Sequence, residues 1–359
     1  MSLCEKMIHE VIRRMIQRRI KHLTMLLFLT LPYTSTFAND NYPSDASQAT
    51  LNLRYEPVQP VPPAKNLDPD KVMLGEILFH DTRLARDNDM SCASCHLLSD
   101  NGANHRHHTL GRNGVELDVN TPTVFNSSLN HQLFWDGRAM NMHQQIDFVV
   151  SSEKEFATSW PVIVKKLKQD KSYVKTFNKL YADGISADSI RDAIITFERS
   201  LVTINSRFDR YLLGDADAIS EEEKKGYQLF KAYGCIACHQ GSNVGGNLFM
   251  KIGIFGNFVS DRGKQEKADL GRFNITGKEA DRHVFRVPSL RLAALTAPYF
   301  HDGSVKTLNQ AVKLMAKYQL GREIPQQDVR LIVAFLKTLP GEYKDKPLLQ
   351  MHQQQDHAQ

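Results

Sequence analysis

The sequence lacks an apolar run long enough to cross a membrane. Its apolar stretch Leu23–Leu31 has nine residues, whereas a helix that spans a bilayer core needs about 20. A basic segment from Arg13 to Lys21 precedes this stretch, and small residues ending at Ala38 follow it. This order predicts a secretory signal peptide at 1–38, cleaved near Ala38. We therefore expect an exported protein without a permanent membrane anchor.

The chain also has little net charge outside this leader. Its formal net charge is +5, and residues 1–38 contain six Lys/Arg against two Asp/Glu. The remaining chain is therefore close to neutral, which argues against nucleic acid or an anionic membrane as a partner. The basic segment is long for a leader, so Met7 and Met15 stay open as alternative start sites.

Cysteine is scarce and almost confined to one kind of motif. Of five cysteines, Cys4 is removed with the leader. The other four form two CxxCH motifs, Cys92-Ala-Ser-Cys95-His96 and Cys235-Ile-Ala-Cys238-His239. No cysteine is left over for another purpose, so the chemistry of the cysteines has to be explained by these two motifs.

Each CxxCH motif suits the covalent attachment of a haem. The two cysteines can form thioethers to the two vinyl groups, while the adjacent His96 or His239 ligates the iron. CxxC pairs also occur in zinc sites and redox disulfides, and these alternatives stay open beside two c-type haems. The sixth ligand decides the chemistry, because a filled position suits electron transfer and an open position suits peroxide or oxygen.

Strand-like alternation is scarce as well, which predicts an all-α fold with long loops. Residues 39–65, rich in Asn, Ser and Pro, predict an extended N-terminal arm. Beyond the arm the chain twice repeats an amphipathic helix, a CxxCH motif, a loop-rich stretch and a closing helix. This plan predicts two cytochrome c domains at 66–214 and 215–345, joined near Gly214–Ile219 and followed by a polar tail at 346–359.

Caps and apolar spacing define these helices. Asp68 and Pro69 are expected to start the first helix, and Ser220 with Glu223 forms a capping box for the helix before the second motif. The apolar residues expected on these two helices are Leu74, Ile77 and Leu78, then Tyr227, Leu229 and Phe230. Those expected on the closing helices are Ile190, Ala193, Ile194, Phe197, Leu201 and Ile204, then Val329, Ile332, Val333, Leu336 and Leu339, before Pro340-Gly341.

Eight motifs between residues 66 and 341 resemble those of one enzyme family. They are Leu74-Gly-Glu-Ile-Leu-Phe79-His-Asp81, Ser91-Cys-Ala-Ser-Cys-His96, Thr121-Pro-Thr-Val-Phe-Asn126, Phe134-Trp-Asp-Gly-Arg138, Phe197-Glu-Arg-Ser-Leu201, Arg207-Phe-Asp-Arg210, Val287-Pro-Ser-Leu-Arg291 and Ala297-Pro-Tyr-Phe-His-Asp-Gly303. In this order they resemble the bacterial di-haem cytochrome c peroxidases and the related MauG enzymes. The resemblance implies a periplasmic enzyme that reduces hydrogen peroxide to water.

The resemblance assigns different roles to the two haems. The His96 haem would be the low-potential site of peroxide cleavage. The His239 haem would receive electrons from a small soluble c-type cytochrome or cupredoxin and store one oxidising equivalent. The family also suggests a homodimer.

The resemblance also implies a sixth ligand for the second iron. In the peroxidase branch a methionine lies 14 residues beyond the histidine of the PYFHDG motif, and here that residue is Met315. MauG proteins have tyrosine at this place, and the nearby Tyr318 does not fall on it. A thioether raises the reduction potential, as an electron-input haem requires. The alternative is that Met315 is a core methionine of its helix.

Three further residues match catalytic positions of the family. Glu155 matches the glutamate that moves a proton between the oxygens of peroxide, and Gln145 matches the glutamine beside it. Composition alone would instead make Glu155 a solvated member of the charged run 153–155. Trp135 matches the tryptophan between the haems, where its ring could assist electron passage, and this role is compatible with a core position.

The family's inter-haem calcium site has counterparts in Asn120 and the main-chain oxygens of Thr296 and Pro298. Oxygen ligation with few carboxylates suits Ca²⁺ completed by water. The alternative is an ordinary turn around Pro298.

The match breaks at the distal ligand of the first haem. Peroxidases of the family usually have an S-x-G-H pattern whose histidine caps the iron until the second haem is reduced. This chain has Thr109-Leu-Gly-Arg112 there, and a protonated arginine cannot ligate iron. We therefore expect an open first haem that needs no reductive activation, with His105, His107 or His108 from a shifted loop as the alternative ligand.

Arg112 itself has more than one candidate role. It could lie over the first haem and stabilise charge on bound peroxide, or it could pair with Asp118 or with a haem propionate. The sequence alone does not separate these roles.

Two other functions stand beside the peroxidase. A MauG-like enzyme would oxidise residues of a partner protein; the missing distal histidine favours it and Met315 argues against it. A non-enzymatic electron carrier would need both irons six-coordinate, with His107 or His108 as the extra ligand.

Overall fold

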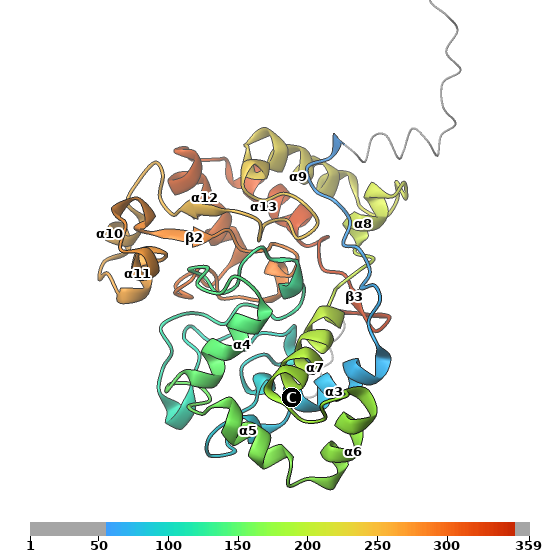
Figure 1. Ribbon diagram of the computed structural model, residues 1–359. Helices are drawn as coiled ribbons and strands as arrows, with labels where there is room; N and C mark the ends of the chain where they lie inside the picture. The colour runs from blue at the N-terminus through green and yellow to red at the C-terminus, as the bar shows by residue number, and fades with distance from the viewer. Residues whose placement is uncertain (1–54, 349–359) are drawn as a thin grey trace, which may run out of the picture. The chain divides into compact units, whose positions relative to one another are not determined.

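Helices carry most of the regular structure and long loops connect them, as the scarcity of strand-like alternation predicts (Figure 1). The computed structural model describes residues 55–348. The predicted signal peptide lies outside the described residues, as do 39–54 of the arm and 349–359 of the tail. The helices are α3 (Pro69–Phe79), α4 (Met142–Ser151), α5 (Trp160–Leu167), α6 (Lys171–Leu180), α7 (Ala187–Ser200), α8 (Arg207–Leu212), α9 (Glu221–Ala232), α10 (Phe258–Arg262), α11 (Phe273–Thr276), α12 (Leu308–Leu320) and α13 (Gln326–Leu336). Two antiparallel pairs of short strands join them, β1 (Phe249–Lys251) with β2 (Val284–Arg286) and β3 (Glu342–Tyr343) with β4 (Lys346–Pro347).

The predicted starts of α3 and α9 are confirmed. The carboxylate of Asp68 accepts the backbone N–H of Asp70 at 2.9 Å, and Ser220 with Glu223 forms a capping box. On α3, however, Ile77 is 53% exposed. The buried face of this helix is therefore narrower than its apolar sequence indicates.

Each helix before a CxxCH motif packs closely against the closing helix of the same half. A Cβ atom added at Gly75 of α3 would lie 2.0 Å from the carbonyl oxygen of Ala193 on α7. One added at Gly226 of α9 would lie 2.0 Å from the carbonyl oxygen of Leu331 on α13. Only glycine permits such a close crossing, and its recurrence shows that the two halves share one packing plan.

The closing helices end earlier than predicted. α7 ends at Ser200, so Leu201 and Ile204 lie beyond it, and α13 ends at Leu336, before Leu339. Leu201 and Leu339 are nonetheless fully buried. The backbone of Ile204 leaves the helix to pair with Glu342. The apolar pattern therefore predicted the burial of Leu201 and Leu339 correctly but predicted their helical conformation wrongly.

Both chain ends within the described region are anchored. Residues 58–65 of the predicted arm contain no helix, and Val58 is fully buried and bridges to Gly241, two residues after the second motif. Residues 346–348, predicted as the start of the polar tail, contribute to β4 and bury Leu348 completely. The tail prediction is therefore wrong for these residues, because their pairing partner lies just upstream in β3.

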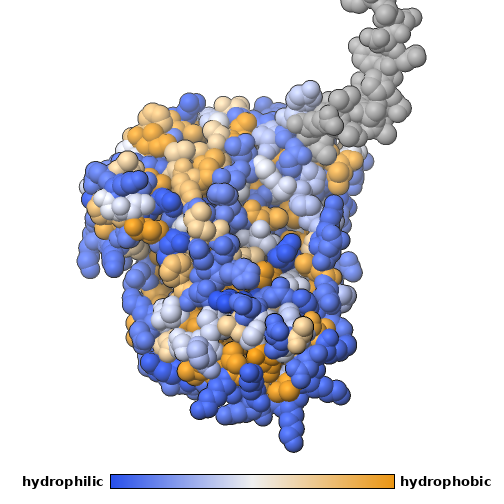
Figure 2. Space-filling model, in the orientation of Figure 1, coloured by the Kyte–Doolittle hydropathy of each residue, from blue (hydrophilic) through white to orange (hydrophobic). Residues whose placement is uncertain are grey.

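Side chains from both predicted domains share a hydrophobic cluster. Phe79, Phe125 and Phe197 pack there with Leu292 and Leu295. The predicted boundary falls in the loop between α8 and α9, and the division into two domains stays a prediction. Among residues 55–348 no helix has the length and apolar character of a membrane span, and the face in Figure 2 intersperses polar with apolar residues.

Candidate active site

Both CxxCH motifs fold into the same tight turn. Cys92–Ser94 and Cys235–Ala237 are short 3-10 turns. The backbone N–H of His96 donates to the carbonyl of Cys92 at 3.0 Å, and that of His239 to Cys235 at 2.9 Å. All four cysteines are unpaired. The structure therefore has no disulfide at either motif, and all four thiols are free to bond a cofactor.

The two motif histidines are held alike. Nδ1 of His96 lies 3.2 Å from the carbonyl oxygen of Gly102, and Nδ1 of His239 lies 3.3 Å from that of Val244. Burial lowers the pKa of both imidazoles, that of His239 to about 4. A neutral ring that donates Nδ1–H to a carbonyl leaves Nε2 free to ligate a metal.

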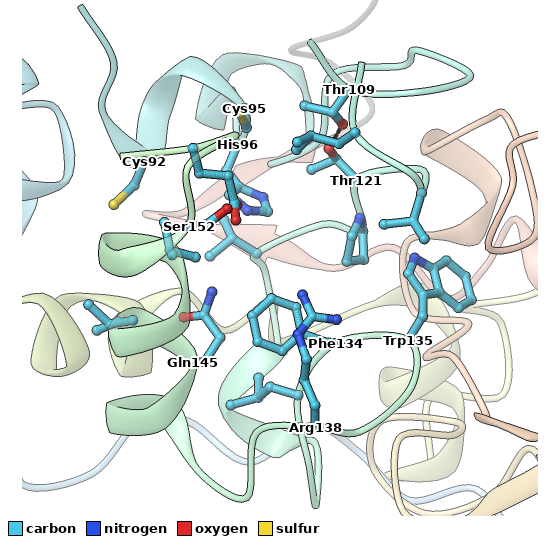
Figure 3. Close-up of a pocket in the computed structure, with 18 of the residues that line it drawn as sticks. Cys92, Cys95, His96, Thr109, Thr121, Phe134, Trp135, Arg138, Gln145 and Ser152 are labelled. Atoms are coloured by element: carbon cyan, nitrogen blue, oxygen red, sulfur yellow. Dashed lines mark hydrogen bonds between the residues drawn. The ribbon is translucent and has the colours of Figure 1, made fainter. Parts of the chain in front are cut away.

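A cavity of about 480 Å³ opens beside the first motif. Cys92, Cys95 and His96 line one side of it, and Gln145 and Arg138 line the other (Figure 3). Free thiols, a histidine with an available Nε2 and an enclosed space occur together here. This combination fits a covalently bound haem.

Glu155 is less exposed than the two residues before it. Glu153 and Lys154 are exposed, whereas Glu155 is half-buried and lines the cavity together with Gln145 of α4. Lys154 also borders this cavity. Burial raises the pKa of Glu155, and a hydrogen bond from Ser152 and the charge of Arg138 oppose that rise. Glu155 is therefore half-buried at the cavity wall, and its catalytic role stays a prediction.

Arg138 lines the same cavity, although the sequence assigned it no role. Its guanidinium lies 3.5 Å from the ring centroid of Phe134 and 3.0 Å from a carboxylate oxygen of Asp136. The cation is therefore fixed near Glu155, where it favours the ionised carboxylate. The residue was visible in the FWDGR motif, but no spacing rule indicated its direction.

Glu198 is a second carboxyl in the cavity that sequence reasoning missed. It lies on α7, is 7% exposed and lines the cavity beside Cys92. Burial raises its pKa to about 7. A charged residue on an amphipathic helix normally predicts the solvent face, so only the packing of α7 reveals its position.

Arg286 gives an independent test of whether a haem fits this cavity. The side chain is 4% exposed and lines the cavity from β2. Its guanidinium donates to the carbonyl of Phe134 and to the amide oxygen of Asn130. Within residues 55–348 no carboxylate pairs with it, and burial lowers its pKa to about 10. A buried cation needs an anionic partner, and the carboxylates of a haem would supply one.

Trp135 lies at the edge of the cavity and is fixed from two directions. Its indole N–H donates to the carbonyl of Asn120 at 2.9 Å. Its own carbonyl accepts the backbone N–H of Arg286 at 2.8 Å. Trp135 therefore contacts both the first and the second half of the chain, and its position between two haems stays a prediction.

The structure brings the segments of the predicted calcium site together. The backbone N–H of Asn120 donates to the carbonyl of His301 at 2.8 Å. His105, fifteen residues upstream of Asn120, contacts the carbonyl of Ala297, which lies between Thr296 and Pro298, at 2.9 Å. Asn120 therefore lies beside the segment with the other two predicted ligands, and the ion itself stays a prediction.

None of the three alternative distal histidines lines the cavity. Both ring nitrogens of His105 contact protein oxygens, those of Ala297 and Asp100. His107 is exposed, and Nε2 of His108 is buried without a hydrogen-bond partner among the described residues. This arrangement favours an open first site, with His108 as the histidine best able to challenge it.

Arg112 lies elsewhere than over the cavity. Its guanidinium pairs with Asp87, whereas Asp118, the protein partner suggested for it, pairs with Lys154 at 2.8 Å. The proposed Arg112–Asp118 pair is therefore wrong. A role of Arg112 toward peroxide stays a prediction that this placement does not favour.

The second motif has an apolar setting. Cys235 packs with a cluster that includes Phe208, Tyr227 and Phe335. Leu308 and Val312 of α12 contact the same cluster. Met315 follows them at the spacing of one helix face and is half-buried, so its predicted role as the ligand of the second iron is geometrically reasonable and stays a prediction.

Comparison with known proteins places these features in a family. A family model described as di-haem cytochrome c peroxidase matches residues 69–217. The cytochrome c551 peroxidase of Nitrosomonas europaea is 41% identical over 291 residues, which cover 81% of this chain and 86% of that protein. The chain belongs to the di-haem cytochrome c peroxidase family. The resemblance and the enzyme class inferred from the sequence are thereby confirmed, and the family implies two haems.

Other relatives range from more similar to more distant proteins. Cytochrome c peroxidase Ccp of Escherichia coli is 46% identical over 291 residues, and the chain spans 62% of that longer protein. The methylamine utilization protein MauG of Methylorubrum extorquens is more distant, 33% identical over 317 residues covering 83% of this chain and 88% of that protein. A MauG-like protein associated with microbial copper homeostasis has the same fold, with a TM-score of 0.67 and 27% identity over 84% of this chain and 95% of its own.

Proposed function

We propose that this protein reduces hydrogen peroxide to water at a haem held by Cys92, Cys95 and His96. The observation that carries the proposal is that Glu155 and Gln145 line the same cavity as these residues, with Gln145 on the side that faces them (Figure 3). The bound haem supplies an iron atom that accepts peroxide and exchanges electrons. The protein has to position peroxide, move its proton and exclude bulk water.

Glu155 is proposed as the group that moves the proton. Heterolytic cleavage of the O–O bond requires a proton to pass from the inner to the outer oxygen. Burial raises the pKa of Glu155 while Ser152 and Arg138 oppose the rise. A carboxyl inside the cavity is a group that can accept and return a proton. Gln145 on the adjoining helix offers an amide N–H for orienting the peroxide.

The second site is proposed as the entry for electrons. Cys235, Cys238 and His239 would hold a haem with Met315 as its other ligand. Its donor would be a small soluble c-type cytochrome or a cupredoxin, met in the periplasm after loss of residues 1–38. Two electrons and two protons convert one hydrogen peroxide to two waters.

We further propose Ca²⁺ at Asn120 and the main-chain oxygens of Thr296 and Pro298, and a homodimer as the assembly. The contacts of Asn120 with His301 and of His105 with Ala297 support the first of these. A calcium ion there would tie the two halves together near Trp135. Removal of calcium with a chelator is therefore expected to slow turnover while both haems stay bound.

The test compares two neighbouring glutamates. Glu155→Gln is expected to lower peroxide turnover by about a hundredfold or more while haem content stays at the wild-type level. Glu153→Gln is the matched control, because the Glu153 side chain is 78% exposed and it should keep wild-type turnover. Equal turnover in all three proteins would remove Glu155 from the reaction. A wild-type protein with two haems and no turnover would favour the electron carrier.

A further inference from the structure

Trp135 and His301 occupy equivalent positions in two copies of one turn. In both copies the residue before Trp135 or His301 has a positive φ, 66° at Phe134 and 68° at Phe300. An isolated antiparallel bridge closes each turn, Leu133 with Ala139 and Tyr299 with Val305. The first half therefore contributes a tryptophan, and the second half a histidine, from the same structural position.

The two rings meet. Their centroids are 6.5 Å apart and their planes cross at 70°, an edge-to-face contact. The peptide of Asn120 links them a second time, because its carbonyl accepts the indole N–H of Trp135 and its N–H donates to the carbonyl of His301. A displacement of His301 would therefore displace the indole in two ways, through the ring contact and through the hydrogen-bonded main chain of Asn120.

His301 is itself held on several sides. Its ring stacks on Phe285 at 4.3 Å, and its Nε2 lies 2.7 Å from the carboxylate of Asp269. Arg262 pairs with Asp269 at 2.6 Å and also with Asp302. The side chains of His301 and Asp269 are 2% and 1% exposed. Arg262 therefore bridges the two carboxylates, and Asp269 in turn fixes the imidazole of His301.

Trp135 is also hydrogen-bonded to two segments, 120–122 and 286–288, each of which adjoins one motif histidine. Residue 120 of the segment 120–122 accepts the indole N–H, and the proline of that segment contacts the His96 ring. Residue 286 of the segment 286–288 donates to the Trp135 carbonyl, and its proline contacts the His239 ring. Trp135 therefore lies where the two main-chain segments that adjoin the motif histidines meet.

We propose that His301 is the positioning residue of this junction: held by Asp269, it fixes Trp135 and so sets the rate at which electrons pass between the two sites. The inference deepens the proposed function and rests on it only in requiring two haems that exchange electrons. Each passage oxidises the His239 site by one electron and reduces the His96 site by one. No atom is transferred, and peroxide is the final acceptor.

The test measures electron passage without peroxide, so it separates this inference from the peroxidase activity. The oxidised two-haem protein is reduced by a flash from a photochemical reductant, and redistribution of the electron between the haems is followed by absorption. His301→Gln is expected to slow redistribution roughly tenfold, with the midpoint potentials of both haems unchanged. Tyr299→Phe is the matched control, because it removes a partly buried hydrogen bond from the same turn to Ala293, and its rate should equal that of wild type.

A double-variant cycle with Trp135→Phe decides whether His301 acts through the indole. The double variant is expected to be no slower than Trp135→Phe alone. In a Trp160→Phe background, where Trp135 is the one tryptophan left, His301→Gln should also shift the ultraviolet Raman band of the indole N–H. Wild-type rates in His301→Gln, additive losses in the double variant, or an equal loss in Tyr299→Phe would each overturn the proposal.

Discussion

Glu198 and Leu336 hold equivalent positions on the two closing helices, and the contrast between them extends to the whole of each site. A Cβ atom at Gly75 would meet Phe197, and one at Gly226 would meet Phe335, so the next residue is Glu198 in one half and Leu336 in the other. Both are buried. One half therefore has a buried carboxyl where the other has an aliphatic core residue.

The surroundings of the two motifs differ in the same sense. The first motif borders a cavity with the carboxyl groups of Glu155 and Glu198 and the cations Arg138 and Arg286. The second packs against an aromatic and aliphatic cluster. The CxxCH turn and its histidine contacts are shared, so they fix only the attachment of the cofactor. In the proposed function, the neighbouring side chains are what separates proton-coupled chemistry at the first site from electron transfer at the second.

The largest effect is expected from removing the proposed ligand of the second iron, which would make the two sites more alike. Met315→Leu keeps the volume of the side chain and removes the thioether, so the second haem should lose its low-spin signal completely and be reduced less readily. Met73→Leu is the control, since Met73 is 57% exposed. A fully low-spin second haem in Met315→Leu would exclude Met315 as the ligand.

A change in pH should sharpen the contrast at Glu198. Burial raises its folded-state pKa from the ordinary 4.5 to about 7, so the folded protein holds an extra proton between these values. The contribution of Glu198 to the free energy of unfolding is therefore fully present below pH 4.5 and is lost as the pH rises through about 7. Glu198→Gln should remove this loss, worth about 2–3 kcal/mol.

Urea unfolding at pH 5 and pH 8 checks this prediction. Wild type should lose more stability than Glu198→Gln between the two pH values, while the exposed-site variant Glu153→Gln should behave like wild type. Parallel losses in wild type and Glu198→Gln would show that the carboxyl is already ionised in the folded protein.

The smallest effect is expected at the close helix crossing that both halves contain. Gly75→Ala and Gly226→Ala each force a methyl group against a helix carbonyl, which should cost about 1–3 kcal/mol. The two losses should be similar because the crossings are alike. A loss below about 0.5 kcal/mol in either variant, measured by thermal unfolding, would contradict the shared packing plan.

The sequence was sufficient wherever a residue's role depends on its near neighbours along the chain. The two CxxCH turns, the Asp68 cap and the Ser220 capping box follow from local geometry. A place for Glu155 in the site was expected only from the family resemblance, since composition alone would have placed it in solvent. The turns and caps need no knowledge of how distant segments meet.

Residues whose partners are remote in sequence escaped prediction. Arg286 of β2 reaches a cavity built largely from residues before 200, Arg112 pairs with Asp87, and Val58 docks beside the second motif. No periodicity or spacing reports such contacts, because tertiary packing brings these segments together. The early ends of α7 and α13 have the same origin, since burial continues where the helix does not.

The most direct test of the central claim, that two alike motifs carry unlike irons, is the electron paramagnetic resonance spectrum of the fully oxidised, calcium-loaded protein before and after one equivalent of peroxide. The account predicts one high-spin haem that reacts at once and one low-spin haem ligated by His239 and Met315. Two low-spin haems that ignore peroxide until one is reduced would contradict it. They would mean that a histidine, with His108 the first to replace, caps the first iron.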